Sequence, residues 1–208
     1  MDNLANVVKD AIVYLEAFHS DMLDAAGLHV TPMSEDDAPS TYEAVCRAFA
    51  EGLYGCYEGA SESSIYNMYG SGVVANWEFR TYHDYLHCTQ GQDFTIAGEA
   101  VLAYTHIFNF RVWALSNKID ADLRRMAERV LLVDTLGQTA LFQVSKGGFA
   151  IDQSDFLVCA LTAPNAQRTL DAALDQWQLP MGGLAYLQAN IMDGGLVSWH
   201  CNCNTTFQ

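Results

Sequence analysis

Three histidines and two acidic residues fall close together in the middle of the chain. His83, Asp84 and His87 stand in the string YHDYLH, and Glu99 and His106 follow in the next apolar segment. On a helix, residues four apart lie about 6 Å from each other at their Cβ atoms, so His83 and His87 can bind the same metal ion. Imidazole nitrogens with carboxylate oxygens suit a divalent transition metal: manganese, iron, cobalt, nickel or zinc. The sequence therefore predicts a metal site and leaves the metal and its nuclearity open.

A further acidic residue, Asp134, stands inside the apolar run VLLVDTL and is expected to point inward. A buried carboxylate without a partner is costly. Asp134 is therefore expected to bind the metal, to orient a ligand histidine, or to pair with Arg80 or Arg111. The expected metal ligands are His83, His87, Glu99, His106 and Asp134, and the expected catalytic carboxylates are Asp84 and Glu99.

Each of these residues also has a purely structural interpretation. A histidine on an apolar helix face is commonly a core residue, and His106 could hydrogen bond to a backbone carbonyl, Tyr82 or Tyr104. Glu99 could lie on the exposed edge of its helix. Against this, it stands among apolar residues, where an ionised carboxylate needs a positive partner.

Three further groups stay open as members of the site. Glu43 has the spacing of a capping box with Ser40, which accounts for it without a function. His19 lies on the apolar side of the first predicted helix. The terminal group His200, Cys201 and Cys203 could bind a soft metal, although its Cys-x-Cys spacing differs from that of a structural zinc site.

Composition limits the classes of partner. The 208 residues are 50% hydrophobic, enough for a sizeable core, and 25 acidic against 10 basic residues give a net charge of −15. Such a charge disfavours duplex DNA and anionic membrane surfaces. We expect no membrane helix, a cytoplasmic location and six cysteines that are free thiols. A small phosphorylated substrate stays compatible, because a bound metal would supply positive charge.

The hydrophobic pattern indicates an all-α, single-domain helical bundle of about six to seven helices. Residues 1–195 form the predicted domain and 196–208 a C-terminal tail. Helices are predicted over about 2–26 with Gly27 as the stop signal, over 40–53, and from Asn76 through the histidine pair. Further helices are expected over 95–114, 120–142, 153–161 and 164–177. Residues 55–75, rich in Gly, Ser and Tyr, are expected to form one long loop with at most a short helix.

The His83-Asp84 dyad resembles that of the HD-domain phosphohydrolases. In those all-helical metal enzymes an early histidine, a His-Asp pair and a later aspartate occur in order, and here His19, His83-Asp84 and Asp134 follow that order. The resemblance implies hydrolysis of phosphate esters of nucleotides. His87 departs from it, because the nucleotidase branch commonly carries an acidic residue near that place.

A second resemblance covers Tyr82-His83-Asp84, His87, Asp93-Phe94 and Gly98-Glu99. This string is similar to one in small uncharacterised proteins encoded by bacteriophages. It implies no activity, but it connects Glu99 to the histidine pair.

Three functions follow from these patterns. The first is a metal-dependent hydrolase acting on a small molecule, such as a nucleotide or another phosphate ester. The second is a helical-bundle di-iron oxidase or oxygenase using Glu43, Glu99, His83, His87 and His106, although the chain has no Glu-x-x-His pair. The third is a non-catalytic acidic binding protein. Oligomeric state stays open, and an aromatic-rich C-terminal third would be compatible with a homo-oligomer.

Overall fold

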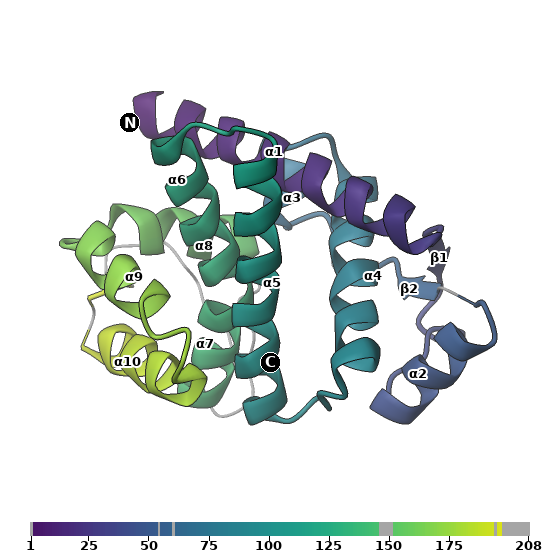
Figure 1. Cartoon of the computed structure of the whole chain (residues 1–208). Coiled ribbons are helices and arrows are strands. Elements are labelled where there is room, and N and C mark those ends of the chain that lie inside the picture. The colour runs from purple at the N-terminus through teal and green to yellow at the C-terminus, as the bar shows by residue number, and fades with distance from the viewer. Residues whose placement is uncertain (1, 54, 60, 146–151, 194, 197–208) are drawn as a thin grey trace.

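Helices dominate the fold (Figure 1). The structure is a computed structural model that describes residues 2–53, 55–59, 61–145, 152–193 and 195–196. Its helices are α1 (Asp2–Ala26), α2 (Tyr42–Ala50), α3 (Ile65–Tyr69), α4 (Val73–Gln90), α5 (Ile96–Ser116), α6 (Ala121–Leu132), α7 (Gln138–Val144), α8 (Gln153–Thr162), α9 (Ala166–Leu174) and α10 (Pro180–Met192). A π-helical segment, η1 (Val133–Gly137), joins α6 to α7. The predicted helical class is confirmed at this level.

Helix α5 occupies the middle of the molecule, with α4 on one side and α9 and α10 on the other (Figure 1). Helix α1 runs across α4, α5 and α6 at one end, and its residues Ile12, Leu15 and Phe18 are fully buried there. Burial of such side chains is worth roughly 1.5–3 kcal/mol each. The predicted stop of α1 at Gly27 is confirmed, because Gly27 takes a positive φ of 68° that a side chain would disfavour.

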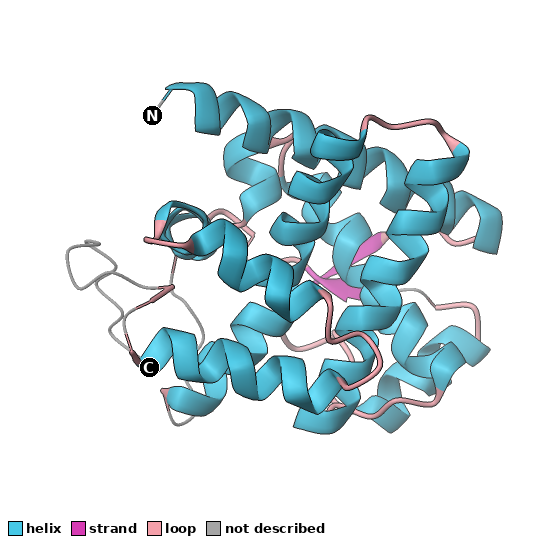
Figure 2. Cartoon of the chain, turned by 60° about the vertical axis from the view of Figure 1, so that its left-hand side comes forward, coloured by secondary structure: helices cyan, strands magenta, loops and turns pink. Residues whose placement is uncertain are grey.

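The fold departs from a purely helical bundle in one place. Strands β1 (Thr31–Met33) and β2 (Gly55–Tyr57) form a small parallel pair beside α4, with Pro32 opposite Cys56 (Figure 2). The expected loop over 55–75 is therefore wrong in part, since it contains β2 and the first turn of α4, whereas α3 agrees with the one short helix that was expected there. Strands of three residues are too short to show the alternation that predicts a strand.

The helices are also more numerous than the six to seven expected. Helix α10 was not expected, because Gly182 and Gly183 within it disfavour a helix. Gly183 is required there by packing, since a Cβ at this position would collide with the hydroxyl of Tyr104. The close approach of α10 to α5 thus outweighs the local preference of the two glycines.

Two predicted helix caps are misplaced, by one residue in α2 and by four in α4. Helix α2 is capped by the side chain of Thr41, which accepts from the Ala44 N–H, rather than by Ser40. Helix α4 begins at Val73, so Asn76 lies inside it rather than capping it. Asn76 is buried, and its amide donates to the Ser61 hydroxyl at 3.0 Å. A polar residue that favours caps is therefore tolerated in the helix because its side chain has a partner elsewhere.

The expectation of free thiols is also corrected. Cys46 of α2 and Cys88 of α4 form a disulfide with their Cα atoms 5.2 Å apart, and Cys159 is disulfide-bonded as well. Among the cysteines that the structure describes, Cys56 is a free, buried thiol. The pairing joins residues 42 positions apart and could not be read from a sequence without regular cysteine spacing.

Over the described part of the chain, no helix has both the length and the apolar character that crossing a membrane requires. Of the predicted tail, residues 196–208, only Leu196 is described, and it is buried; the rest lies outside the described residues.

Candidate metal centre

A tight connection between α4 and α5 brings Glu99 next to the histidine pair. Gly91 ends α4 with a φ of 65°, and the amide of Gln92 donates to the carbonyl of His87 at 3.0 Å. Thr95 then caps α5 by accepting from the Gly98 N–H, while its hydroxyl donates to Asp93. The two helices therefore run antiparallel, with the last turn of α4 beside the first turn of α5.

Gly98 is needed for this arrangement. A Cβ on Gly98 would collide with the backbone carbonyl of Asp93, so any side chain at this position would push the connection away from α5. Because Glu99 is the next residue, its direction depends on that close approach.

The three predicted ligands His83, His87 and Glu99 converge. The Nε2 atoms of His83 and His87 are 3.2 Å apart, and they lie 3.3 and 3.4 Å from the two carboxylate oxygens of Glu99. One ligand atom from each residue falls within 4.8 Å of the others, so the group can hold a metal ion. Two imidazoles and one carboxylate form a common ligand set for transition metals.

The orientation of the His87 ring is fixed by a hydrogen bond on the side away from Glu99. Its Nδ1 donates to the backbone carbonyl of Gln92 at 2.7 Å, which leaves Nε2 as the lone-pair atom facing His83 and Glu99. Metal-bound histidines usually donate their second nitrogen in this way, which sets the tautomer and the ring direction. Phe94 packs edge-on against the same ring with centroids 4.7 Å apart.

Charge within the group favours a carboxylate ion. Burial alone would raise the pKa of Glu99, but hydrogen bonds from His83 and His87 outweigh it and lower the pKa to about 2. Burial opposes protonation of His83, yet the hydrogen bond and charge of Glu99 prevail and raise the pKa of His83. The cluster thus attracts positive charge, which a proton or a metal cation can supply.

One side of the group reaches solvent. The side chains of His83 and Glu99 are 20% and 25% exposed, whereas His87 is fully buried. A catalytic metal keeps one coordination position open for water or substrate, while a structural one is enclosed. The partial exposure of two ligands is compatible with the catalytic type.

His106, a predicted ligand, is not brought into this group. It is fully buried and its Nε2 lies 2.9 Å from Nε2 of His19, so α1 and α5 share a second histidine pair. Burial lowers the pKa of His19 to about 3 and that of His106 well below its usual range. The expected partners of His106, a backbone carbonyl or a tyrosine, are replaced by His19.

Asp134 is only partly buried, and it too lies outside the group of three ligands. It stands in the π-helical segment η1, and burial raises its pKa to about 7, against the opposing charges of Arg80 and His83. Arg111, an expected partner for Asp134, pairs with Glu128 instead. Asp134 is therefore a neighbour of His83 in the same electrostatic environment rather than a member of its ligand set.

Asp84, one of the two predicted catalytic carboxylates, is close enough to all three ligands for their charges to shift its pKa. Burial raises its pKa, while the charges of His83 and His87 act in the opposite direction. Asp84 follows His83 on α4 but does not belong to the group of three ligands. Glu43 is exposed on α2 and is not part of the group, and His200, Cys201 and Cys203 lie outside the described residues.

The sequence did not single out the residues that aim the ligands. The Gln92 carbonyl, the Thr95 cap and Gly98 are the main ones. The Thr95-to-Gly98 spacing was a usable signal for the start of α5. The role of the Gln92 backbone carbonyl cannot be predicted from the sequence, because every residue has such a group.

Comparison of this chain with protein-family models, with curated proteins and with solved structures gave no match.

Proposed function

We propose that the protein is a metal-dependent hydrolase with a single-metal centre held by His83, His87 and Glu99. The observation that carries the proposal is the convergence of two Nε2 atoms and one carboxylate within hydrogen-bonding distance at a partly exposed edge. A divalent transition metal in such a set lowers the pKa of bound water and polarises the bond to be cleaved.

The surrounding residues supply the remaining roles. The His87 ring is held by the Gln92 carbonyl, so its ligand atom needs no rearrangement on binding. Asp84 is the carboxylate that we assign as general base, taking the proton from the attacking water as the new bond to substrate forms. The leaving group departs as an oxyanion and takes a proton from solvent at the open edge.

The proposed substrate is a small phosphate ester, such as a nucleotide. With a net charge of −15, the chain offers little attraction for phosphate elsewhere, and a bound dication would create it locally. His19 pairs with His106, and neither Asp84 nor Asp134 belongs to the group of three ligands, so the order of these residues that resembles HD-domain enzymes does not carry this proposal.

A second candidate uses the same three ligands. Two histidines and one carboxylate also hold iron in mononuclear oxygenases, which keep open positions for dioxygen. The two-iron version has less support, because Glu43 is exposed and His106 is paired with His19. Within the described residues, one group of three or more potential ligands is found.

The test loads chelator-treated protein with manganese, iron, cobalt, nickel or zinc and assays phosphate release from a panel of nucleotides. The hydrolase proposal predicts metal-dependent release that is lost in Glu99→Gln. Dioxygen consumption with iron, without phosphate release, would favour the oxygenase. Metal binding without phosphate release or dioxygen consumption would contradict both the hydrolase and the oxygenase. Absence of metal binding would favour the non-catalytic acidic binding protein.

A further inference from the structure

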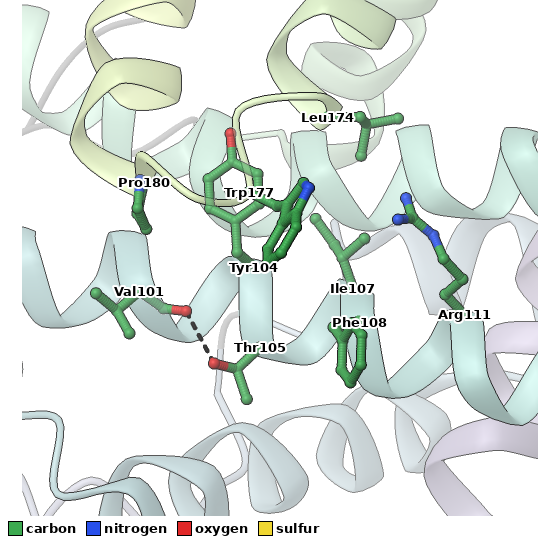
Figure 3. Close-up of a pocket in the computed structure, with 9 residues that line it drawn as sticks. All are labelled: Val101, Tyr104, Thr105, Ile107, Phe108, Arg111, Leu174, Trp177 and Pro180. Carbon is green, nitrogen blue, oxygen red and sulfur yellow. Dashed lines mark hydrogen bonds between the residues drawn. The ribbon is translucent and has the colours of Figure 1, made fainter.

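A separate pocket of about 450 Å³ lies between α5 and the corner where α9 turns into α10 (Figure 3). Val101, Tyr104 and Phe108 line it from α5, and Trp177 and Pro180 line it from the corner. Glu99 faces α4 from the other side of α5. The pocket is therefore not the substrate entrance of the candidate metal centre.

The walls of the pocket are apolar and carry two exposed aromatic rings. Phe108 is 58% exposed and Trp177 is 56% exposed. Ligand sites are typically concave and apolar, with a few polar groups that fix orientation, and span about 300–1,000 Å³. The volume and lining of this pocket fit a small molecule with a hydrocarbon body.

The polar group at one end of the pocket is Arg111 (Figure 3). Its Nε and Nη2 donate to the two carboxylate oxygens of Glu128 at 2.8 and 2.9 Å. Its Nη1 has no hydrogen-bond partner in the part of the chain that the structure describes, so this N–H group can donate to a ligand.

Arg111 belongs to a network of ion pairs that has one more guanidinium group than carboxylates. Glu128, which is 2% exposed, also forms an ion pair with Arg125 at 3.1 Å. Arg125 and Arg129 both form ion pairs with Asp171. Together with Arg124 and Asp175, four guanidinium groups meet three carboxylates. The region has a net charge of +1, although the whole chain carries −15. An anion is repelled less at this end of the pocket than over most of the molecule.

We propose that this pocket binds a small amphipathic anion, with a single carboxylate at Arg111 and an aliphatic chain along Phe108, Tyr104 and Trp177. A medium-chain fatty acid has this chemistry. A protein partner would need roughly 1,000 Å² of complementary surface. A concave pocket with one charged end instead suits a ligand that has one charged end.

The test titrates decanoate, below its micelle concentration, by calorimetry and by tryptophan fluorescence, with decanol as the neutral analogue of the same chain length. Thr105→Phe fills the pocket, and Arg111→Gln removes its charge while Arg125 still pairs with Glu128. Val13→Phe, at an exposed position of α1, is the matched control for enlarging an apolar surface. Trp177→Phe assigns the fluorescence change to the pocket.

We expect one decanoate per chain, bound at least about 10-fold more tightly than decanol. Both pocket variants should weaken decanoate at least about 10-fold, and Val13→Phe should leave it unchanged. Arg111→Gln should not lower the affinity for decanol. This comparison tests the proposal even if Thr105→Phe fails to fold. No saturable binding, equal affinity for decanol, or full affinity in Arg111→Gln would overturn the proposal. Self-association through this face without decanoate binding would overturn it as well.

Discussion

The molecule contains two histidine pairs that differ in their surroundings. His83 and His87 lie on one helix and share a carboxylate at a partly exposed edge, so we call them the open pair. His19 and His106 come from α1 and α5 and are fully buried among Phe18, Tyr66, Phe79 and Tyr82, so we call them the closed pair. The two Nε2 atoms are 2.9 Å apart in the closed pair and 3.2 Å apart in the open pair.

The comparison shows that the distance between two imidazoles does not define a metal site. A cation in the closed pair would be surrounded by aromatic rings, with no carboxylate in hydrogen-bonding contact with either imidazole among the described residues. Burial there favours neutral rings, whereas Glu99 favours positive charge at the open pair. We therefore expect the two pairs to respond differently to metal, pH and mutation.

The largest expected effect concerns the disulfide between Cys46 and Cys88, which joins α2 to α4 one residue beyond His87. Removing it in a Cys46→Ser, Cys88→Ser double variant should lower the free energy of unfolding by about 4 kcal/mol, from the loop-entropy relation for its 42-residue separation. Denaturant unfolding measures the loss. Metal affinity should fall as well, because the end of α4 gains freedom. An unchanged unfolding midpoint would show that the disulfide does not restrain α4.

The next effect is stabilisation by metal. At a free metal concentration of 100 times Kd, the wild-type chain should gain about 2.7 kcal/mol in unfolding free energy. Glu99→Gln should remove this gain, and His106→Phe should keep it, because only the open pair is expected to bind. Equal metal-dependent gains in unfolding free energy in Glu99→Gln and His106→Phe would contradict the proposed difference between the two pairs.

The closed pair should control stability in acid. Burial keeps the pKa of His19 at about 3 and that of His106 well below its usual range, so the folded chain leaves both rings neutral. The unfolded chain protonates them below about pH 6.5. Their contribution is complete above that pH and declines as the pH falls, by about 1.4 kcal/mol per pH unit for each ring.

Asp134 acts in the opposite direction, because burial raises its pKa to about 7 and the folded chain keeps a proton that the unfolded chain loses above about pH 4. As the pH falls from 6.5 to 4, the two histidines lower the free energy of unfolding and Asp134 raises it. The net loss should be about 1.4 kcal/mol per pH unit. Replacing His106 by Phe should flatten this slope. Unfolding free energies across that range test it, and a slope unchanged by the substitution would contradict neutral burial of His106.

The smallest expected effect comes from the connection between α4 and α5. Gly98→Ala would push Asp93 away and misdirect Glu99, so metal affinity should fall by about 10-fold or more. Gly182→Ala is the matched control, since a Cβ there meets only ordinary contacts, 3.5 Å from Leu179 Cβ. Isothermal titration with metal compares the two. Full affinity in Gly98→Ala would mean that Glu99 reaches the histidines without this close approach.

The sequence predicted those parts of the fold that depend on local patterns. The apolar stripe of α1, the Gly27 stop and the helix after Asp120 each follow from neighbouring residues, and the structure confirms them. It did not predict α10, where the packing of Gly183 against Tyr104 outweighs helix propensity. Nor did it predict the Cys46–Cys88 disulfide, because its partners meet only in the folded chain.

The same limit applies to the candidate site. His83 and His87 are one helical turn apart, so local spacing was enough to group them, and the short connection to α5 explains why Glu99 joins them. His106 shares a helix with Glu99, but seven residues carry it to the level of α1, where it meets His19. Distances between helices decide which histidines meet, and no local pattern reports them.

The most direct measurement is the metal content of chains that carry His87→Ala or His106→Ala, determined by equilibrium dialysis and elemental analysis beside the wild type. The account predicts one metal per chain in the wild type and in His106→Ala, and a loss of affinity of at least about 100-fold in His87→Ala. Retention of the metal by His87→Ala, or its loss from His106→Ala, would contradict the assignment of the centre to His83, His87 and Glu99.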